Sequence, residues 1–235
     1  MPDFAGLHVV VTGGTGALGT AVVGALRAGG AECHVTNFVA AELDRYAHRG
    51  DPKVHVTTGV DLADEAAVRR FYEGLPSLWA SVHLAGGFAM APVAETSGDD
   101  FEAQFRMNTL SCFLCSAAAV RAIRNSGGNG GRIVNVSARP ALEPRSGAGM
   151  AAYTASKAAV AALTQAMGEE LVGEDIWVNA VAPSVLDTPA NRAAMPKAKH
   201  ERWVHPDAIA AVIAFLASPD NKVTRAAVLP VYGGS

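Results

Sequence analysis

The sequence has few cysteines, few aromatic residues and no strong excess of charge of either sign. Three cysteines in 235 residues are too few for a disulfide framework, so we expect a reducing compartment such as the cytoplasm. A formal net charge of −3 argues against nucleic acid or an anionic membrane as partner. The apolar runs AVAALTQAM and AIAAVIAFLA are shorter than the roughly 18 residues of a membrane span. These absences leave a small molecule as the expected partner.

Cys112 and Cys115 form a C-x-x-C pattern inside the run TLSCFLCSAAAV. The run is apolar with helical spacing, and no second pair of metal-binding residues accompanies it. We therefore interpret both cysteines as small core residues and predict no metal site.

Half of the residues are hydrophobic, and short β-branched runs alternate with longer alanine-rich segments of helical period. The predicted strands are 7–12, 31–37, 53–58, 78–85, 132–138, 175–182 and 226–232. The predicted helices are 17–28, 40–48, 64–73, 99–124, 150–172 and 207–217, and the turn NSGGNGG follows the fourth. Apolar strands separated by helices predict one α/β domain, 1–235, with a doubly wound, mostly parallel seven-stranded sheet covered by helices on both faces.

A glycine-rich turn, TGGTGALG, joins the first predicted strand to the first predicted helix. Glycines permit a tight turn and close approach of a pyrophosphate, and the helix N-terminus offers free N–H groups and a positive dipole. Such a turn alone is also typical of ordinary loops, but its position between strand and helix favours a dinucleotide site. The predicted contacts in this turn are Gly13, Thr15, Gly16, Ala17 and Leu18. Those expected near adenine and ribose, at later strand ends, are Asp61, Leu62, Ala85, Gly86 and Gly87.

The second predicted strand ends at Asn37, where a carboxylate would bind the ribose 2′-OH of NAD and an arginine would favour the 2′-phosphate of NADP. Neither is present. We expect Asn37 to face the ribose without repelling a phosphate, and Arg45 lies too far along the chain to replace an arginine there. The choice between NAD(H) and NADP(H) stays open.

Tyr153 and Lys157 are four residues apart, on one face of the fifth predicted helix. A nearby ammonium stabilises a tyrosine phenolate, so the pair can donate or accept a proton as a hydride moves. A Tyr/Lys pair on a helix is usually solvated surface. Its place after the fifth strand, opposite the glycine turn, favours a catalytic role.

With these motifs the sequence resembles the short-chain dehydrogenase/reductase family over essentially its whole length. The matching segments, in the family's order, are 12–19, Asp61, 85–86, Asn108, Tyr153 with Lys157, 178–183, 188–189 and 233–234. The resemblance implies a Rossmann fold and hydride transfer to or from NAD(H) or NADP(H), and it favours NADH. It implies that Tyr153 donates the proton, that Lys157 binds the nicotinamide ribose and lowers the tyrosine pKa, and that Asn108 holds a relay water. It further implies cofactor contacts from Pro183, Val185 and Thr188, a short substrate lid over about 184–205, and a homodimer or homotetramer paired through the two long helices.

Several departures resemble the dihydropteridine reductase branch of that family. Ala17 replaces a glycine, His83-Leu84 replaces two asparagines, and Ala138 stands where the usual catalytic serine would be. Ser137 is the neighbouring hydroxyl. Because side chains alternate along a strand, we expect Ser137 to face away from the nicotinamide, although a bulge at the strand end would turn it inward.

Three hypotheses about function stay open. The first is a reductase of quinonoid dihydropterin or a similar flat acceptor, and the second is a general carbonyl reductase or alcohol dehydrogenase. The third is a non-catalytic nucleotide-sensing protein, against which the intact Tyr153/Lys157 pair argues. We interpret His83 as a structural residue and expect Arg139, Leu186 and Trp203 to line a fairly open substrate pocket.

Overall fold

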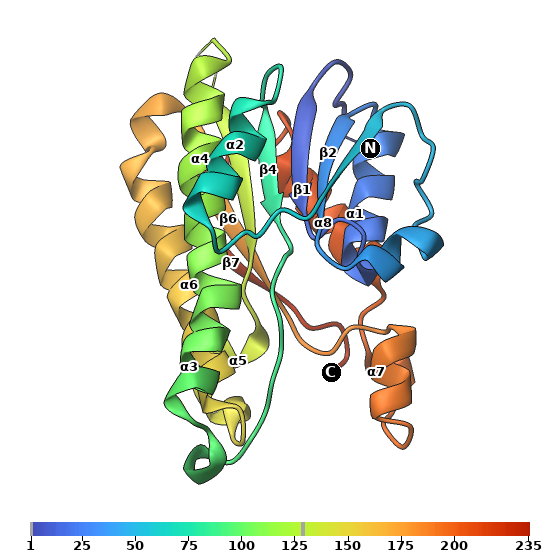
Figure 1. Ribbon diagram of the computed structural model, residues 1–235, viewed down its shortest axis with the longest axis vertical. Helices are drawn as coiled ribbons and strands as arrows, with labels where there is room; N and C mark the ends of the chain where they lie inside the picture. The colour runs from blue at the N-terminus through green and yellow to red at the C-terminus, as the bar shows by residue number, and fades with distance from the viewer. Residues whose placement is uncertain (1, 128–129) are drawn as a thin grey trace.

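Seven parallel strands form one sheet in the computed structural model, which describes residues 2–127 and 130–235. The order across the sheet is β3-β2-β1-β4-β5-β6-β7 (Figure 1). The strands are β1 His8–Thr12, β2 Glu32–Asn37, β3 Val54–Thr58, β4 Ala80–His83, β5 Gly131–Val136, β6 Ile176–Pro183 and β7 Val228–Val231. The strands β2 and β3 are added on one side of β1, and the strands from β4 onward are added on its other side. Doubly wound sheets bind their ligands at this switch point, between β1 and β4. The predicted fold class is confirmed.

Helices cover both faces of the sheet (Figure 1). Helices α1 Ala17–Ala28 and α8 Pro206–Ala217 pack against each other on one face. The other face carries α2 Glu65–Glu73, α4 Ser111–Asn125 and α6 Ala151–Glu170. The shorter helices are α3 Gly98–Gln104, α5 Arg139–Leu142 and α7 Pro189–Ala194. Valines on alternate faces of β1 supply both layers of the core, since Val9 and Val11 pack toward α1 while Val10 packs toward α2 and α4.

Two predicted helices differ in the structure. Segment 40–48 forms only a 3-10 helix, Ala40–Arg45, because no residue between Ala40 and Arg45 is buried to anchor a longer helix. The long helix predicted over 99–124 starts one residue earlier at Gly98, where Ser97 and Asp100 form a capping box, and is interrupted by a π-helical turn, Phe105–Leu110. Gly128 and Asn129 of the predicted NSGGNGG turn lie outside the described residues.

The two cysteines of the C-x-x-C pattern are core residues, as the sequence predicts. Cys112 and Cys115 are free, buried thiols on α4, and burial raises the pKa of Cys112 to about 11. Within the described residues, no helix is both long and apolar enough to cross a bilayer.

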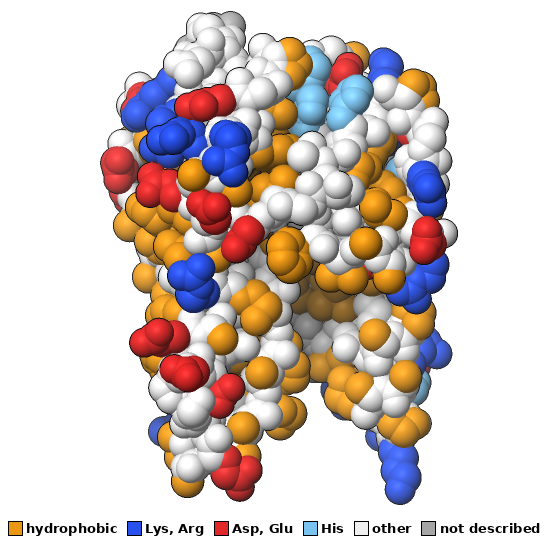
Figure 2. Space-filling model, in the orientation of Figure 1, with side chains coloured by type: hydrophobic (Ala, Val, Ile, Leu, Met, Phe, Trp, Pro, Cys, Tyr) orange, Lys and Arg blue, Asp and Glu red, His pale blue; other side chains and the backbone are white. Residues whose placement is uncertain are grey.

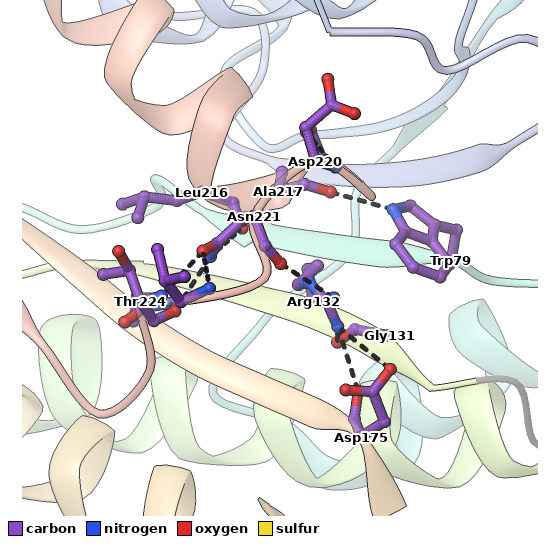
Figure 3. Close-up of polar contacts among 12 residues, drawn as sticks. Trp79, Gly131, Arg132, Asp175, Leu216, Ala217, Asp220, Asn221 and Thr224 are labelled. Atoms are coloured by element: carbon purple, nitrogen blue, oxygen red, sulfur yellow. Dashed lines mark hydrogen bonds and ion pairs between the residues drawn. The ribbon is translucent and has the colours of Figure 1, made fainter.

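A buried arginine, Arg132, lies at the amino-terminal end of β5 and connects it to neighbouring segments (Figure 3). Arg132 on β5 donates to the carbonyl oxygens of Asp175 at 3.0 Å and Asn221 at 3.0 Å. Its guanidinium lies 4.4 Å from the ring centre of Trp177 and 5.2 Å from that of Trp79. Burial lowers the Arg132 pKa. These contacts tie β5 to the start of β6 and to the loop after α8.

Candidate active site

The turn between β1 and α1 has the geometry of a phosphate site. Gly13 has a φ of +64°, and a Cβ there would lie 3.0 Å from the backbone nitrogen of Ala85, so glycine is required. Gly16 is the N-cap of α1, and no side chain in the described part of the chain caps that helix end. The N–H groups of its first turn are therefore available to an anion.

A cavity of about 600 Å³ opens beside this turn, at the carboxyl ends of β1, β2 and β4. The predicted cofactor residues that line it are Gly13, Thr15, Gly16, Asp61, Leu62, Ala85 and Gly86. Thr36, Phe38, Val39, Glu42, Ala103, Arg106 and Met107 also line it. The size of the cavity, its glycine-lined floor and the helix N-terminus beside it fit the adenosine and pyrophosphate of a dinucleotide.

Asn37 is not among the residues that line this cavity, and its contact with the ribose stays a prediction. Its side chain is 2% exposed and donates to Thr15 Oγ1 at 2.9 Å and to the Val39 carbonyl at 3.0 Å. The amide therefore holds the turn after β2. Glu42 lines the cavity instead and accepts a hydrogen bond from Thr15 Oγ1 at 2.5 Å. Sequence reasoning missed Glu42, because a carboxylate five residues beyond a strand reaches the cavity only if the intervening turn is tight.

The tyrosine and lysine of α6 lie at the carboxyl end of β5. Lys157 is buried and its Nζ donates to the carbonyl of Val136 at 2.9 Å, which fixes the ammonium at the strand end. Burial lowers the Lys157 pKa to about 8 and raises the Tyr153 pKa to about 12. The Tyr153 phenol therefore keeps its proton at neutral pH. Its ring meets the exposed Phe88 edge-on, with 5.0 Å between centroids.

Asn108 joins three parts of the site from the π-helical turn between α3 and α4. Its Oδ1 accepts from the Gly87 N–H at 2.9 Å, and its Nδ2 donates to the Gly87 carbonyl at 3.1 Å and to Ser156 Oγ at 3.1 Å. A Cβ on Gly86 would lie 2.6 Å from Asn108 Oδ1 and 3.3 Å from Lys157 Nζ. The loop after β4, Asn108 and Lys157 thus converge on one point, and π-helical turns are frequent at functional sites.

Ser137 points away from this point of convergence. Its hydroxyl is buried and donates to the backbone carbonyl of Lys157 at 2.8 Å, as strand alternation predicted, and Ala138 contributes only a methyl group at the N-cap of α5. The bond ties the end of β5 to α6 beside Lys157.

The His83 side chain, on β4, is held by hydrogen bonds within the protein core. Its Nδ1 lies 2.8 Å from Asn135 Oδ1 and its Nε2 lies 2.8 Å from Ser81 Oγ. Burial lowers the His83 pKa to about 4, so the ring is neutral at physiological pH. Both ring nitrogens are occupied by the core, and neither is available to a substrate.

The substrate side is open. In Figure 1, α3 and α5 extend beyond the sheet on one side and α7 on the other, and Figure 2 shows the molecule hollowed between them. The predicted lid segment 184–205 contains α7 and the 3-10 helix His200–Arg202. Pro183 ends β6, Val185 follows it, and Thr188 caps α7 by accepting from the Asn191 N–H at 3.2 Å.

Of the three predicted pocket residues, Arg139 forms an ion pair with Glu143 at 2.8 Å and lies over the ring of Tyr232 at 5.0 Å. Leu186 forms a β-bridge with Val204, and Trp203 packs on His200. Ala17 and Thr188 line a second groove, beside α1, rather than the cavity at the glycine turn, while Leu18 packs against the core. Within residues 2–127 and 130–235, no cluster of three His, Cys, Asp or Glu side chains could hold a metal ion.

Comparisons with known proteins agree with this geometry. The family model described as short chain dehydrogenase matches residues 7–199. A short-chain type dehydrogenase/reductase of Picea abies is 30% identical over 218 residues, which cover 86% of this chain and 79% of that protein. L-xylulose reductase of Bos taurus is 31% identical over 240 residues, which cover 98% of this chain and 96% of that protein. A crystal structure of a dehydrogenase/reductase from Sinorhizobium meliloti 1021 superposes with a TM-score of 0.84 at 28% identity, over 99% of this chain and 96% of that chain. The chain therefore belongs to the short-chain dehydrogenase/reductase family of oxidoreductases, whose members use NAD(H) or NADP(H).

Proposed function

We propose that this oxidoreductase reduces a flat, conjugated acceptor such as quinonoid dihydropterin, with Tyr153 as its proton donor. One observation carries the proposal: Ala138 supplies no hydroxyl, and the Ser137 hydroxyl is held by the Lys157 carbonyl. A simple ketone concentrates negative charge on one oxygen during hydride addition, and additional donors stabilise that charge. A conjugated acceptor spreads the charge over its ring system and needs only one proton donor.

The residues of the site have distinct roles in this reaction. The bound nicotinamide supplies the hydride, and the acceptor gains that hydride together with one proton. Tyr153 gives the proton from its phenol, which the high pKa keeps protonated before the reaction. Lys157, one turn along α6, stabilises the phenolate that remains. Asn108 fixes the backbone of Gly87, beside Gly86, and this backbone would hold the nicotinamide half of the cofactor.

A second candidate is the reduction of a carbonyl compound or oxidation of an alcohol. It is favoured by the relatedness of almost the whole chain to L-xylulose reductase, and by D-threitol dehydrogenase of Mycolicibacterium smegmatis, 27% identical over 97% of this chain.

A substrate panel tests the two candidates. Oxidation of NADH and NADPH is followed with quinonoid dihydropterin, with quinones, and with simple ketones and ketoses. We expect the conjugated acceptors to have the highest kcat/KM. The matched variant Ala138→Ser restores a hydroxyl at the position where the family has its catalytic serine. It should raise kcat/KM for ketones, because a further donor stabilises the charge on the ketone oxygen, and it should leave kcat/KM for conjugated acceptors within about threefold. Preference of the unchanged protein for ketones would contradict the first candidate and support the second.

We further propose that the chain works as a homodimer or homotetramer in the cytoplasm. Support for an oligomer comes from apolar side chains on the long helices, where the exposed Phe113 and the half-buried Phe105 and Leu163 border a shallow groove. Support for a reducing compartment comes from the three cysteines, all of them free and buried.

A further inference from the structure

The turn after β2 brings a carboxylate back to the glycine turn. Phe38 and Val39 are exposed, at 73% and 53%, and the short 3-10 helix that follows reverses the chain. As a result Glu42 reaches Thr15, and its Oε2 accepts from Thr15 Oγ1 at 2.5 Å. Glu42 and Thr15 both line the large cavity beside the N-terminus of α1.

The hydrogen bonds around Thr15 have only one consistent direction. Asn37 Nδ2 is a donor, and it donates to Thr15 Oγ1 and to the Val39 carbonyl. The Thr15 hydroxyl has a single proton, and Glu42 Oε2 accepts it. The chain Asn37 to Thr15 to Glu42 therefore holds the carboxylate in a fixed orientation. Among the described residues, no hydrogen bond uses the other oxygen, Oε1, which is free to accept from a ligand.

We infer that Glu42 selects NAD(H) over NADP(H) by accepting a hydrogen bond from the adenosine ribose and repelling a 2′-phosphate. The inference rests on the dinucleotide use of the proposed function and adds the discriminating residue, which lies five positions beyond the end of β2. A 2′-phosphate carries up to two negative charges, and a fixed carboxylate a few ångströms away disfavours it strongly.

The positive charges near the cavity do not cancel this carboxylate. Arg106 lines the cavity from the π-helical turn, on the side of Ala63, whose carbonyl it approaches at 3.5 Å. Arg49 is exposed and paired with Asp44 at 3.5 Å, and Arg45 is exposed on the same short helix without lining the cavity. Among the described residues, Glu42 is thus the charged side chain that hydrogen-bonds to the glycine turn.

Equilibrium binding of the two cofactors tests the inference without relying on turnover. Dissociation constants of NADH and NADPH are measured by fluorescence titration and calorimetry for the unchanged protein and for Glu42→Gln. The amide of the variant still accepts from Thr15, so the turn keeps its hydrogen bond while the charge is lost. The matched control is Asp44→Asn, which removes an exposed carboxylate two residues away on the same helix, where its side chain is 81% exposed.

We expect the unchanged protein to bind NADH more tightly than NADPH. Glu42→Gln should shift the ratio of the two constants toward NADPH by about tenfold or more, whereas Asp44→Asn should change it less than twofold. The same comparison with 5′-AMP and 2′,5′-ADP should show the shift in the adenosine half alone.

Tighter binding of NADPH by the unchanged protein would overturn the inference. So would a ratio that Glu42→Gln leaves within twofold, or an equal shift from Asp44→Asn, which would point to a general charge effect. In each of these cases the protein still binds dinucleotides, and the proposed function stands. Failure to bind either dinucleotide would overturn both together.

Discussion

Replacing Ser137 by alanine should leave the reaction nearly intact, although Ser137 is the hydroxyl next to the position that the family reserves for a catalytic serine. In the structure the hydroxyl donates to the Lys157 carbonyl at 2.8 Å and is buried. The net value of such a bond is about 1 kcal/mol. The Lys157 carbonyl keeps its helical partner four residues along α6, so the substitution does not leave it without a donor.

The expected effect of Ser137→Ala is therefore on stability rather than on chemistry. The free energy of unfolding should fall by about 1 kcal/mol, and kcat/KM should fall less than about tenfold, which corresponds to 1.36 kcal/mol of barrier. Urea unfolding and steady-state kinetics on the same preparation measure both quantities. A loss of a hundredfold or more with cofactor affinity unchanged would show that Ser137 turns toward the substrate during the reaction, and that the alternation of side chains at the end of β5 differs in the working enzyme.

Three further predictions concern the rest of the molecule. Arg132→Met should lower the free energy of unfolding by about 1–3 kcal/mol, because the Asn221 carbonyl loses its donor, whereas the Asp175 carbonyl keeps the Gly131 N–H. NADH affinity should stay constant, and unchanged stability in urea would contradict this role. Burial lowers the pKa of both His34 and His83 from 6.5 to about 4, so the unfolded chain binds more protons in that window. Unfolding free energy should therefore be fully present above pH 6.5 and decline toward pH 4, and a flat profile in urea unfolding would contradict it. Sedimentation equilibrium at micromolar concentration should show a dimer or tetramer, and a monomer would exclude pairing through the long helices.

Much of the fold could be predicted from local patterns because those patterns are strong in this chain. The β-branched runs at 7–12 and 132–138 became β1 and β5, and the glycine turn lies between β1 and α1 as predicted. The orientation of Ser137 also followed from a local rule, since side chains alternate along a strand.

Features that depend on tertiary contacts could not be predicted in this way. Segment 40–48 has the helical composition that suggested a helix, yet only 40–45 is helical and in a 3-10 form. The tight turn after β2 brings Glu42 to Thr15, and Asn37 also donates to Thr15, an arrangement that no periodicity of the sequence reveals. The interruption of the long helix at 105–110 and the burial of Arg132 between two tryptophans likewise depend on packing between distant segments.

The central claim is that Tyr153 donates the proton in a nicotinamide-dependent reduction, and Tyr153→Phe tests it most directly. The variant removes one hydroxyl and keeps the ring that packs against Phe88. Turnover of NADH with the best acceptor of the panel is measured beside the NADH dissociation constant. Loss of a positioned proton donor should lower kcat by a hundredfold or more while NADH affinity changes less than about threefold. A variant that retains kcat within tenfold of the unchanged protein, with the same affinity for NADH, would contradict the claim.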